Sequence, residues 1–285
     1  MRPGARRIDG VASLLVLLWL SSPAAAQTPK HDGSYLKNIE LCNRMDRASL
    51  DARIDGCTAF IDARQGPTAA LAIAFNNRGN ARIVKEDYDR AIADFGRSIE
   101  LNPNYPKPFN NRGVAYLKKG EVDLAIKAFD QAIKLNPNYA EAFANRAGSY
   151  LKTREYDRAA RDYDEAIRLE PDLGAAWSGR CWSRAMLGAL QAALEDCDKA
   201  LGAGSSNAAS YDSRGLIYLK MGRLDAAIED YGFALRIEPK LASALYGRGL
   251  ARLKQGDKAG GETDIAAAET IQPGIGDDFT RYGVR

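Results

Sequence analysis

Small and aromatic residues recur from residue 72 onward with a period of 34 residues, without insertion or deletion. Within each unit, one set falls at unit positions 4, 8 and 11 and a second set at positions 20, 24 and 27. Each spacing places its residues on one face of an α-helix. In the unit that begins at Pro106, Gly120 at position 15 and Pro137 at position 32 suit the ends of two helices. The pattern predicts a helix-turn-helix in every unit.

The same residue types return at the same positions in all six units. The units begin at Ala72, Pro106, Ala140, Gly174, Ala208 and Ala242. Position 4 holds Phe75, Phe109, Phe143, Trp177, Tyr211 and Leu245, position 20 holds Ala91, Ala125, Ala159, Ala193, Ala227 and Gly261, and position 32 holds Pro103, Pro137, Pro171, Ser205, Pro239 and Pro273. The chain thereby resembles the tetratricopeptide repeat (TPR) family. The resemblance implies an all-α fold, a right-handed superhelical solenoid in which helix pairs stack to bury both faces.

The solenoid is expected to span residues 35–275. Residues 35–71 resemble a degenerate first repeat, with helices from Tyr35 to Met45 and from Leu50 to Ala63. The segment 276–285 carries Phe279, Tyr282 and Val284, which could cover the apolar face of the last helix. Terminal repeats are expected to be atypical because one of their faces meets water. We interpret residues 276–285 as a C-terminal cap.

Residues 1–26 have the pattern of a signal peptide. Three arginines precede an apolar run over residues 11–20, and small residues at Ala24 and Ala26 suit cleavage before Gln27. The run is about half of the roughly 20 apolar residues that a bilayer span requires, so a permanent anchor is the weaker alternative. We therefore expect an exported protein, periplasmic or secreted, with a disordered mature N-terminus over residues 27–34 and no stable membrane anchor after cleavage.

The composition excludes several classes of function. Forty Lys and Arg residues against thirty-seven Asp and Glu give a net charge of +3, which argues against a nucleic-acid binder with a concentrated basic face. His31 is the one histidine, so catalytic triads, Cys/His dyads and histidine-based zinc sites are improbable. The sequence also lacks a phosphate-binding loop and a dinucleotide fingerprint. We expect neither an enzyme nor a protein with a cofactor.

Four cysteines form two similarly spaced pairs. Cys181 and Cys197 lie at positions 8 and 24 of one unit, which face each other across its two helices. Cys42 and Cys57 have nearly the same separation, and alignment places Cys57 at position 24 of the degenerate repeat. A metal site would need distant repeats to touch, and a reactive thiol would need a basic microenvironment. Structural disulfides within each pair are the favoured interpretation, and they suit an exported protein.

Arginine occupies position 7 of all six units, and aspartate occupies position 23 of five, Ala128 being the exception. A row of guanidinium groups could bind anions. Position 7 lies beside the packed positions 4, 8 and 11, however, so each arginine is better interpreted as the partner of a nearby aspartate or helix-end carbonyl. These arginines are therefore not counted as a binding site.

Asparagine recurs on the surface that the resemblance assigns to ligands, the concave face formed by the first helix of each unit. Asn76, Asn77, Asn110, Asn111 and Asn145 lie at positions 5 and 6 of the first three units. An amide carries a donor and an acceptor, so a row of amides can pair with the backbone of an extended peptide. The recurrence resembles the asparagine ladders of peptide-binding members of the family. The alternative is that asparagine is tolerated on a solvated helix face.

Lysines outnumber acids at the expected groove positions. The lysines are Lys107, Lys118, Lys152, Lys220 and Lys254, and the acids are Glu141 and Asp212. An acidic or carboxyl-terminal segment of a partner would fit such a surface, although charge on an exposed helix face also serves solubility alone. The favoured function is an exported scaffold that binds an extended segment of a partner protein. The alternative is a solenoid that binds cell-envelope or exported polysaccharide, for which Trp182 and Tyr246 are the groove aromatics.

Overall fold

A computed structural model of the chain describes residues 33–43, 50–64, 66–203 and 207–284. Within these residues the chain folds into helix pairs, with no strand. The helices are α1 (Gly33–Asn43), α2 (Leu50–Ala63), α3 (Thr68–Val84), α4 (Tyr88–Leu101), α5 (Pro106–Lys118), α6 (Val122–Leu135), α7 (Ala140–Lys152), α8 (Tyr156–Leu169), α9 (Gly174–Met186), α10 (Leu190–Gly202), α11 (Ala208–Lys220), α12 (Leu224–Ile237), α13 (Ala242–Gln255), α14 (Lys258–Ile271) and α15 (Ile275–Arg281). The predicted signal segment and Met45 lie outside the described residues.

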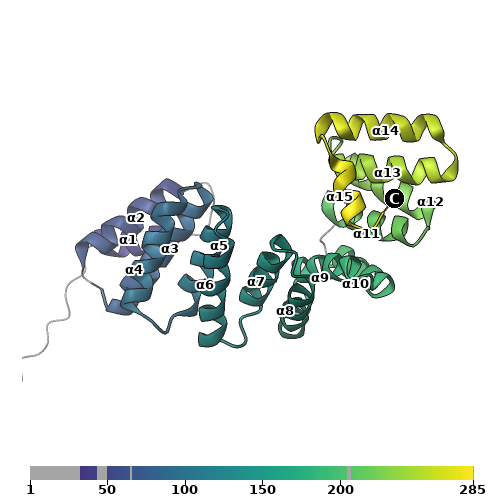
Figure 1. Ribbon diagram of the computed structural model, residues 1–285. Helices are drawn as coiled ribbons and strands as arrows, with labels where there is room; N and C mark the ends of the chain where they lie inside the picture. Colours follow the sequence, from purple (N-terminus) through teal and green to yellow (C-terminus); the bar gives the residue numbers. More distant parts are fainter. Residues whose placement is uncertain (1–32, 44–49, 65, 204–206, 285) are drawn as a thin grey trace, which may run out of the picture.

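The helix pairs stack in sequence order into a curved solenoid (Figure 1). Odd-numbered helices of adjacent pairs approach each other, as α3 does α5 and α5 does α7. The even-numbered helices of adjacent pairs do not come as close in the described part of the chain. The odd-numbered helices therefore form the inner, concave surface and the even-numbered helices the outer one. The all-α solenoid expected from the repeat pattern is confirmed.

A glycine and an aromatic residue hold the two helices of a repeat together. A Cβ added to Gly79 would lie 2.6 Å from the Phe95 ring, and one added to Gly113 would lie 2.5 Å from the Phe129 ring. Phe95 and Phe129 are fully buried. Position 8 must therefore be small wherever position 24 carries a ring, because the ring occupies the space of a side chain.

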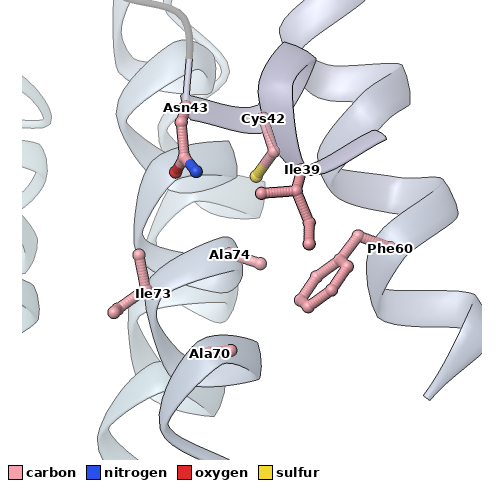
Figure 2. Close-up of a pocket in the computed structure, with 7 residues that line it drawn as sticks. All are labelled: Ile39, Cys42, Asn43, Phe60, Ala70, Ile73 and Ala74. Atoms are coloured by element: carbon pink, nitrogen blue, oxygen red, sulfur yellow. The ribbon is translucent and has the colours of Figure 1, made fainter. Parts of the chain in front are cut away.

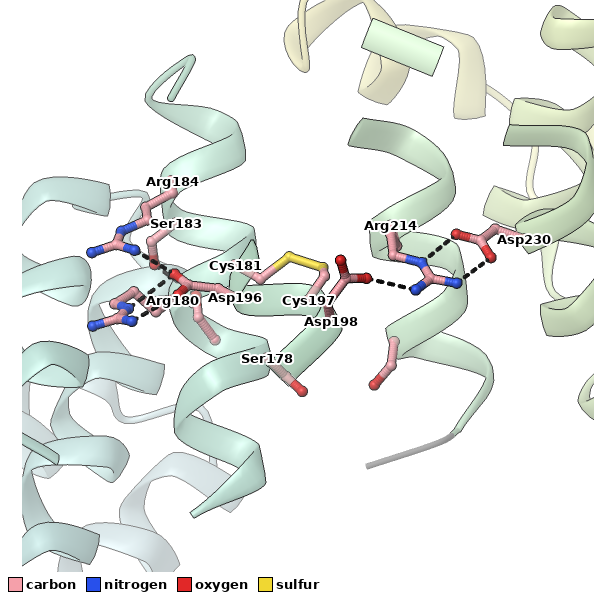
Figure 3. The surroundings of a disulfide bond; sticks show 12 residues. Ser178, Arg180, Cys181, Ser183, Arg184, Asp196, Cys197, Asp198, Arg214 and Asp230 are labelled. Atoms are coloured by element: carbon pink, nitrogen blue, oxygen red, sulfur yellow. Dashed lines mark hydrogen bonds and ion pairs between the residues drawn. A yellow bond between two sulfur atoms is a disulfide. The ribbon is translucent and has the colours of Figure 1, made fainter. Parts of the chain in front are cut away.

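Two repeats have a disulfide bond in this place. Cys181 and Cys197, at the positions of the glycine and the ring, are joined within the α9–α10 pair (Figure 3). Cys42 and Cys57 are joined in the same way within the α1–α2 pair. A covalent bond thus fastens the two helices where other repeats rely on ring packing.

The turn between the two helices of a repeat contains a residue in the left-handed conformation. Gly120, Gly188 and Gly222 occupy it with φ between 73° and 82°. Glu86 and Arg154 occupy the same repeat position with φ of 61°. A side chain there costs roughly 1 kcal/mol or more relative to glycine. The helix pairing therefore determines the turn geometry even where the sequence disfavours it.

The ion pairs predicted for position 7 are confirmed in five repeats. In each, the arginine donates two hydrogen bonds of 2.7–3.0 Å to the aspartate at position 23. The pairs are Arg78–Asp94, Arg146–Asp162, Arg180–Asp196, Arg214–Asp230 and Arg248–Asp264. Every one of these aspartates is buried, and Figure 3 shows two of the pairs. Bidentate geometry and burial make these arginines part of the repeat's framework.

The C-terminal segment packs against the inner surface of the last repeats. Ile275, Phe279 and Val284 are buried, and α15 contacts both α13 and α14. The Tyr282 ring lies edge-on to Trp182 of α9, with the ring centroids 5.2 Å apart. The segment therefore extends beyond the last helix pair and crosses the concave face toward α9 (Figure 1). No helix among the described residues is long and apolar enough to cross a bilayer.

Candidate functional site

An open groove lies on the inner surface of the first three full repeats. Its volume is about 640 Å³. Most of its lining belongs to α3, α5 and the residues that precede α5 and α7. The lining residues are Arg53, Asn76, Asn77, Asn80, Ile83, Val84, Tyr105, Lys107, Asn111, Val114, Tyr139 and Glu141. Amide, phenol, charged and aliphatic groups thus meet in one groove of the concave surface.

The predicted asparagine ladder is a continuous chain of hydrogen bonds. Between repeats, Asn145 Nδ2 donates to Asn110 Oδ1 at 3.0 Å, and Asn111 Nδ2 donates to Asn76 Oδ1 at 2.9 Å. Within a repeat, Asn110 donates to Asn111 and Asn76 donates to Asn77, at 3.3 and 3.4 Å. Each amide donates to the next in the order Asn145, Asn110, Asn111, Asn76 and Asn77, an arrangement in which neighbouring hydrogen bonds polarise one another.

The two residues of each asparagine pair have different environments. Asn76 and Asn110 are only 3% and 5% exposed, whereas Asn77, Asn111 and Asn145 are half-buried. At the N-terminal end of this series of hydrogen bonds, Asn77 Nδ2 donates to Asn43 Oδ1 at 3.0 Å. Position 5 therefore links adjacent repeats. Of the position 6 residues, Asn77 and Asn111 line the groove, whereas Asn145 lies beyond its lining. Each amide nitrogen carries two N–H donors, so Asn111 and Asn145 retain one beyond the bond described.

Two tyrosines in the groove were not identified from the sequence. Tyr105 and Tyr139 occupy the last position of their units, immediately before α5 and α7, and both line the groove. Burial, with Glu141 and Tyr105 adding to it, raises the pKa of Tyr139 to about 12. Burial also raises the pKa of Tyr105. Both phenols are protonated at neutral pH and can donate a hydrogen bond to a ligand.

The charged groove residues differ in their availability. Lys107 and Glu141 line the groove and are exposed. Lys118 and Lys152 are exposed at the C-terminal ends of α5 and α7 and are not part of this lining. Lys220 donates from Nζ to the Ala185 carbonyl oxygen at 2.9 Å, and burial lowers its pKa. The groove lining therefore carries one exposed lysine, one exposed glutamate and the buried Arg53 beside its amides, not a uniformly basic surface.

A small apolar pocket lies beside the N-terminal end of the amide chain. It has a volume of about 120 Å³ and lies between α1, α2 and α3 (Figure 2). The lining residues are Ile39, Cys42, Asn43, Phe60, Ala70, Ile73 and Ala74. Ile73 is 44% exposed, so the pocket has an apolar edge open to solvent. It has the size and polarity to accept one aliphatic side chain.

The inner surface of the last repeats is already occupied. Trp182 contacts Tyr282, and Tyr246 packs against Phe279 with the ring centroids 4.8 Å apart. The C-terminal segment thus covers both aromatic residues that the sequence places in this part of the groove. An added ligand therefore finds open concave surface chiefly over α3, α5 and α7.

Asp212 in α11 is half-buried, with one carboxylate oxygen fully buried, at the repeat position that Asn76 and Asn110 occupy. Its Oδ2 accepts a 2.8 Å hydrogen bond from the Ser243 hydroxyl, while its buried Oδ1 has no hydrogen-bond partner. Burial raises the pKa of Asp212 to about 7, and Glu238 adds to the effect. The folded protein therefore binds the Asp212 proton more tightly than the unfolded chain does. As the pH rises from about 4 to about 7, the contribution of Asp212 to the free energy of unfolding becomes less favourable.

Asp212→Asn is expected to stabilise the protein more at pH 8 than at pH 5. The neutral amide removes the cost of a buried carboxylate, so the difference in stabilisation should be about 1–3 kcal/mol. Thermal or urea unfolding at the two pH values measures it. Asp172→Asn, at an exposed position, is the control and should show no such difference. If Asp212→Asn changed the free energy of unfolding equally at both pH values, the raised pKa of Asp212 would be contradicted.

Comparison with known proteins agrees with the repeat architecture. Tetratricopeptide repeat models match residues 106–139 and 144–208, and a TPR repeat model matches residues 79–120 and 215–256. Together they cover more than half of the chain, and no curated protein sequence matches it significantly. The helix pairs, their 34-residue period and these matches define a helical-repeat scaffold. The chain belongs to the tetratricopeptide repeat family.

Solved structures share the fold at low sequence identity. A tetratricopeptide repeat protein from Parabacteroides merdae is 18% identical, with 88% of this chain and 98% of that chain covered and a TM-score of 0.62. Pseudomonas aeruginosa PilF is 14% identical, with 76% and 97% covered and a TM-score of 0.65. YrrB, described as a TPR protein with an unusual peptide-binding site, is 20% identical, with 63% and 93% covered and a TM-score of 0.52.

Proposed function

We propose that this protein is an exported interaction scaffold that binds an extended segment of a partner protein in the groove over α3, α5 and α7. The observation that carries the proposal is the amide chain along an open groove. Asn77, Asn111 and Asn145 recur at one repeat position and are held at fixed spacing by Asn76 and Asn110. A preorganised row of amides reduces the ordering cost of binding a peptide backbone.

The groove offers a peptide both backbone and side-chain contacts. The remaining N–H donor of Asn111 can bond to a peptide carbonyl oxygen in the groove, and the phenols of Tyr105 and Tyr139 add further donors. The remaining donor of Asn145, in α7 beyond the lining, can bond to a continuing segment of the peptide. The apolar pocket beside α1 can take an aliphatic side chain. Lys107 and Glu141 can select charged side chains of either sign, and Lys118 and Lys152 can attract acidic residues beyond the groove.

Two further observations support protein binding and export. YrrB, which shares the fold, is described as having a peptide-binding site. The polysaccharide alternative relied on Trp182 and Tyr246, whose rings contact the C-terminal segment. The two disulfide bonds suit an oxidising compartment, periplasmic or extracellular, to which the predicted signal segment would direct the chain.

Val84→Glu is expected to weaken peptide binding by about tenfold to a hundredfold, because it places an unpaired charge against an apolar part of the ligand. Val84 lines the groove and is 51% exposed, so the change should leave the melting temperature nearly unaltered. The ligand is a peptide selected from a random library on the parent protein, and titration calorimetry measures its affinity.

The matched control is Leu124→Glu, which adds the same charge at a comparably exposed aliphatic residue of α6, on the outer surface. It should bind the selected peptide as the parent does. Equal affinity of the Val84 variant and the parent would remove the groove as the binding surface. If both variants bound the peptide equally weakly, the added charge itself, and not its place in the groove, would account for the loss of affinity.

A further inference from the structure

One arginine of the repeated ion-pair framework lacks both of its usual acidic partners. Arg112 in α5 occupies position 7, but position 23 of its repeat is Ala128 instead of aspartate. Three other arginines bind a second aspartate, at position 25 of the preceding repeat, at 2.6–2.7 Å. These pairs are Arg146–Asp130, Arg180–Asp164 and Arg214–Asp198. For Arg112 the corresponding residue in α4 is Gly96.

Arg112 nevertheless has the placement of the paired arginines. Its guanidinium carbon lies 5.6 Å from the Phe109 ring centroid, the same distance as Arg146 from Phe143. Arg112 Nε is buried and has no hydrogen-bond partner. No ion pair within the described ranges includes this arginine. A buried donor without an acceptor destabilises the fold, so binding of an incoming acceptor would be favoured.

The space that an acidic partner would use is open. A Cβ added to Gly96 would meet no atom within 4 Å, whereas one added to Gly113 would meet the Phe129 ring. Gly96 and Arg112 are both half-buried, so both can be reached from solvent. In later repeats an aspartate fills this place from within the chain. In this repeat the two positions that carry aspartate elsewhere hold Ala128 and Gly96.

We propose that Arg112 is a docking point for a carboxylate, presented by an aspartate or glutamate side chain of a protein partner in the space beside Gly96. The bidentate geometry of the other five repeats shows which anion this arrangement fits, because their arginines each bind both oxygens of a carboxylate. This site lies apart from the lining of the concave groove and would hold a partner at a second point. It does not depend on peptide binding in the groove.

The test follows the Nε–Hε resonance of Arg112 by NMR, assigned from its loss in Arg112→Lys. The probes are acetyl-triglutamate amide, acetyl-triglutamine amide and inorganic phosphate. The glutamate peptide should shift this resonance saturably, the glutamine peptide should not, and phosphate should bind more weakly. Gly96→Asp supplies a tethered carboxylate, so it should shift the resonance without peptide and weaken glutamate-peptide binding about tenfold.

Gly232→Asp is the control, because it adds the same charge at position 25 of a later repeat and should leave the Arg112 resonance and its titration unchanged. Ala128→Asp restores the missing partner at position 23 and should act as Gly96→Asp does. If the glutamate peptide did not change the chemical shift of the Arg112 resonance, the proposal would be overturned. Tighter binding of phosphate than of the glutamate peptide, or a titration unchanged by Gly96→Asp, would overturn it as well.

Discussion

Replacing Asp196 with alanine is expected to lower the free energy of unfolding by about 3–5 kcal/mol. Asp196 is 2% exposed and accepts hydrogen bonds from Arg180 Nε and Nη2 and from Arg184 Nη1, at 2.7–2.9 Å. Removing the carboxylate leaves two guanidinium groups without their buried partner. Urea unfolding of the parent and the variant measures the difference.

The control is Asp164→Ala, because Asp164 also pairs with Arg180, at 2.6 Å, but is about half exposed. An exposed pair contributes about 0–1 kcal/mol, so this variant should unfold close to the parent. The comparison separates burial from the mere presence of an ion pair. Similar losses in the two variants would contradict the structural role assigned to the aspartate at position 23.

Replacing Cys181 and Cys197 together with alanine is expected to lower the free energy of unfolding by about 3 kcal/mol. The bond closes a loop between residues 16 apart, which restricts the unfolded chain. The variant also loses the contact that takes the place of the Gly–Phe packing of other repeats, so its α9–α10 pair should loosen first. Chemical denaturation measures the global loss, and hydrogen exchange of α9 and α10 measures the local one.

The Cys42–Cys57 pair supplies the comparison, since its residues are 15 apart and it fastens the first helix pair. Its double alanine variant should lose a similar amount, with the increase in hydrogen exchange confined to α1 and α2. A reductant should lower the melting temperature of the parent more than that of either variant. A melting temperature of the parent that does not respond to reductant would contradict these expectations.

The repeat period made most of the fold predictable, because position within a unit determines packing. The residues at positions 8 and 24 must fit each other, so Gly113 and Phe129 in one repeat and Cys181 and Cys197 in another can be compared directly. In five repeats the arginine at position 7 likewise pairs with the aspartate at position 23. Both kinds of contact join positions of the same 34-residue unit, so they can be predicted from the repeat pattern of the sequence.

The parts that the sequence did not predict depend on how repeats stack. The bond from Asn111 to Asn76 joins residues 35 apart and requires the superhelical placement of α5 beside α3. Tyr105 lies at a unit's last position, outside the helix faces that the pattern describes. The contact of Tyr282 with Trp182 joins residues about a hundred positions apart, which no 34-residue period encodes.

Because the asparagines bond to one another, substituting them would change stability and ligand binding together. Alanine at position 111 would remove a hydrogen bond to the buried Asn76, so such a variant would lose stability as well as ligand contacts. Groove residues without this structural role are better probes. Asn80 lines the groove and is half-buried in α3, and its side chain makes no hydrogen bond to another residue in the described part of the chain.

The most direct test of the groove is site-specific photo-cross-linking in cells that make the full chain. A photoreactive phenylalanine analogue at position 80 or 107 lies in the groove, and one at position 124 lies on the outer surface. We expect the groove positions to form an adduct with a partner protein, which mass spectrometry should locate in one extended segment of that partner. Val84→Glu should remove this adduct. Adducts from position 124 alone, or groove adducts that persist in the Val84→Glu variant, would contradict the proposed binding in the groove.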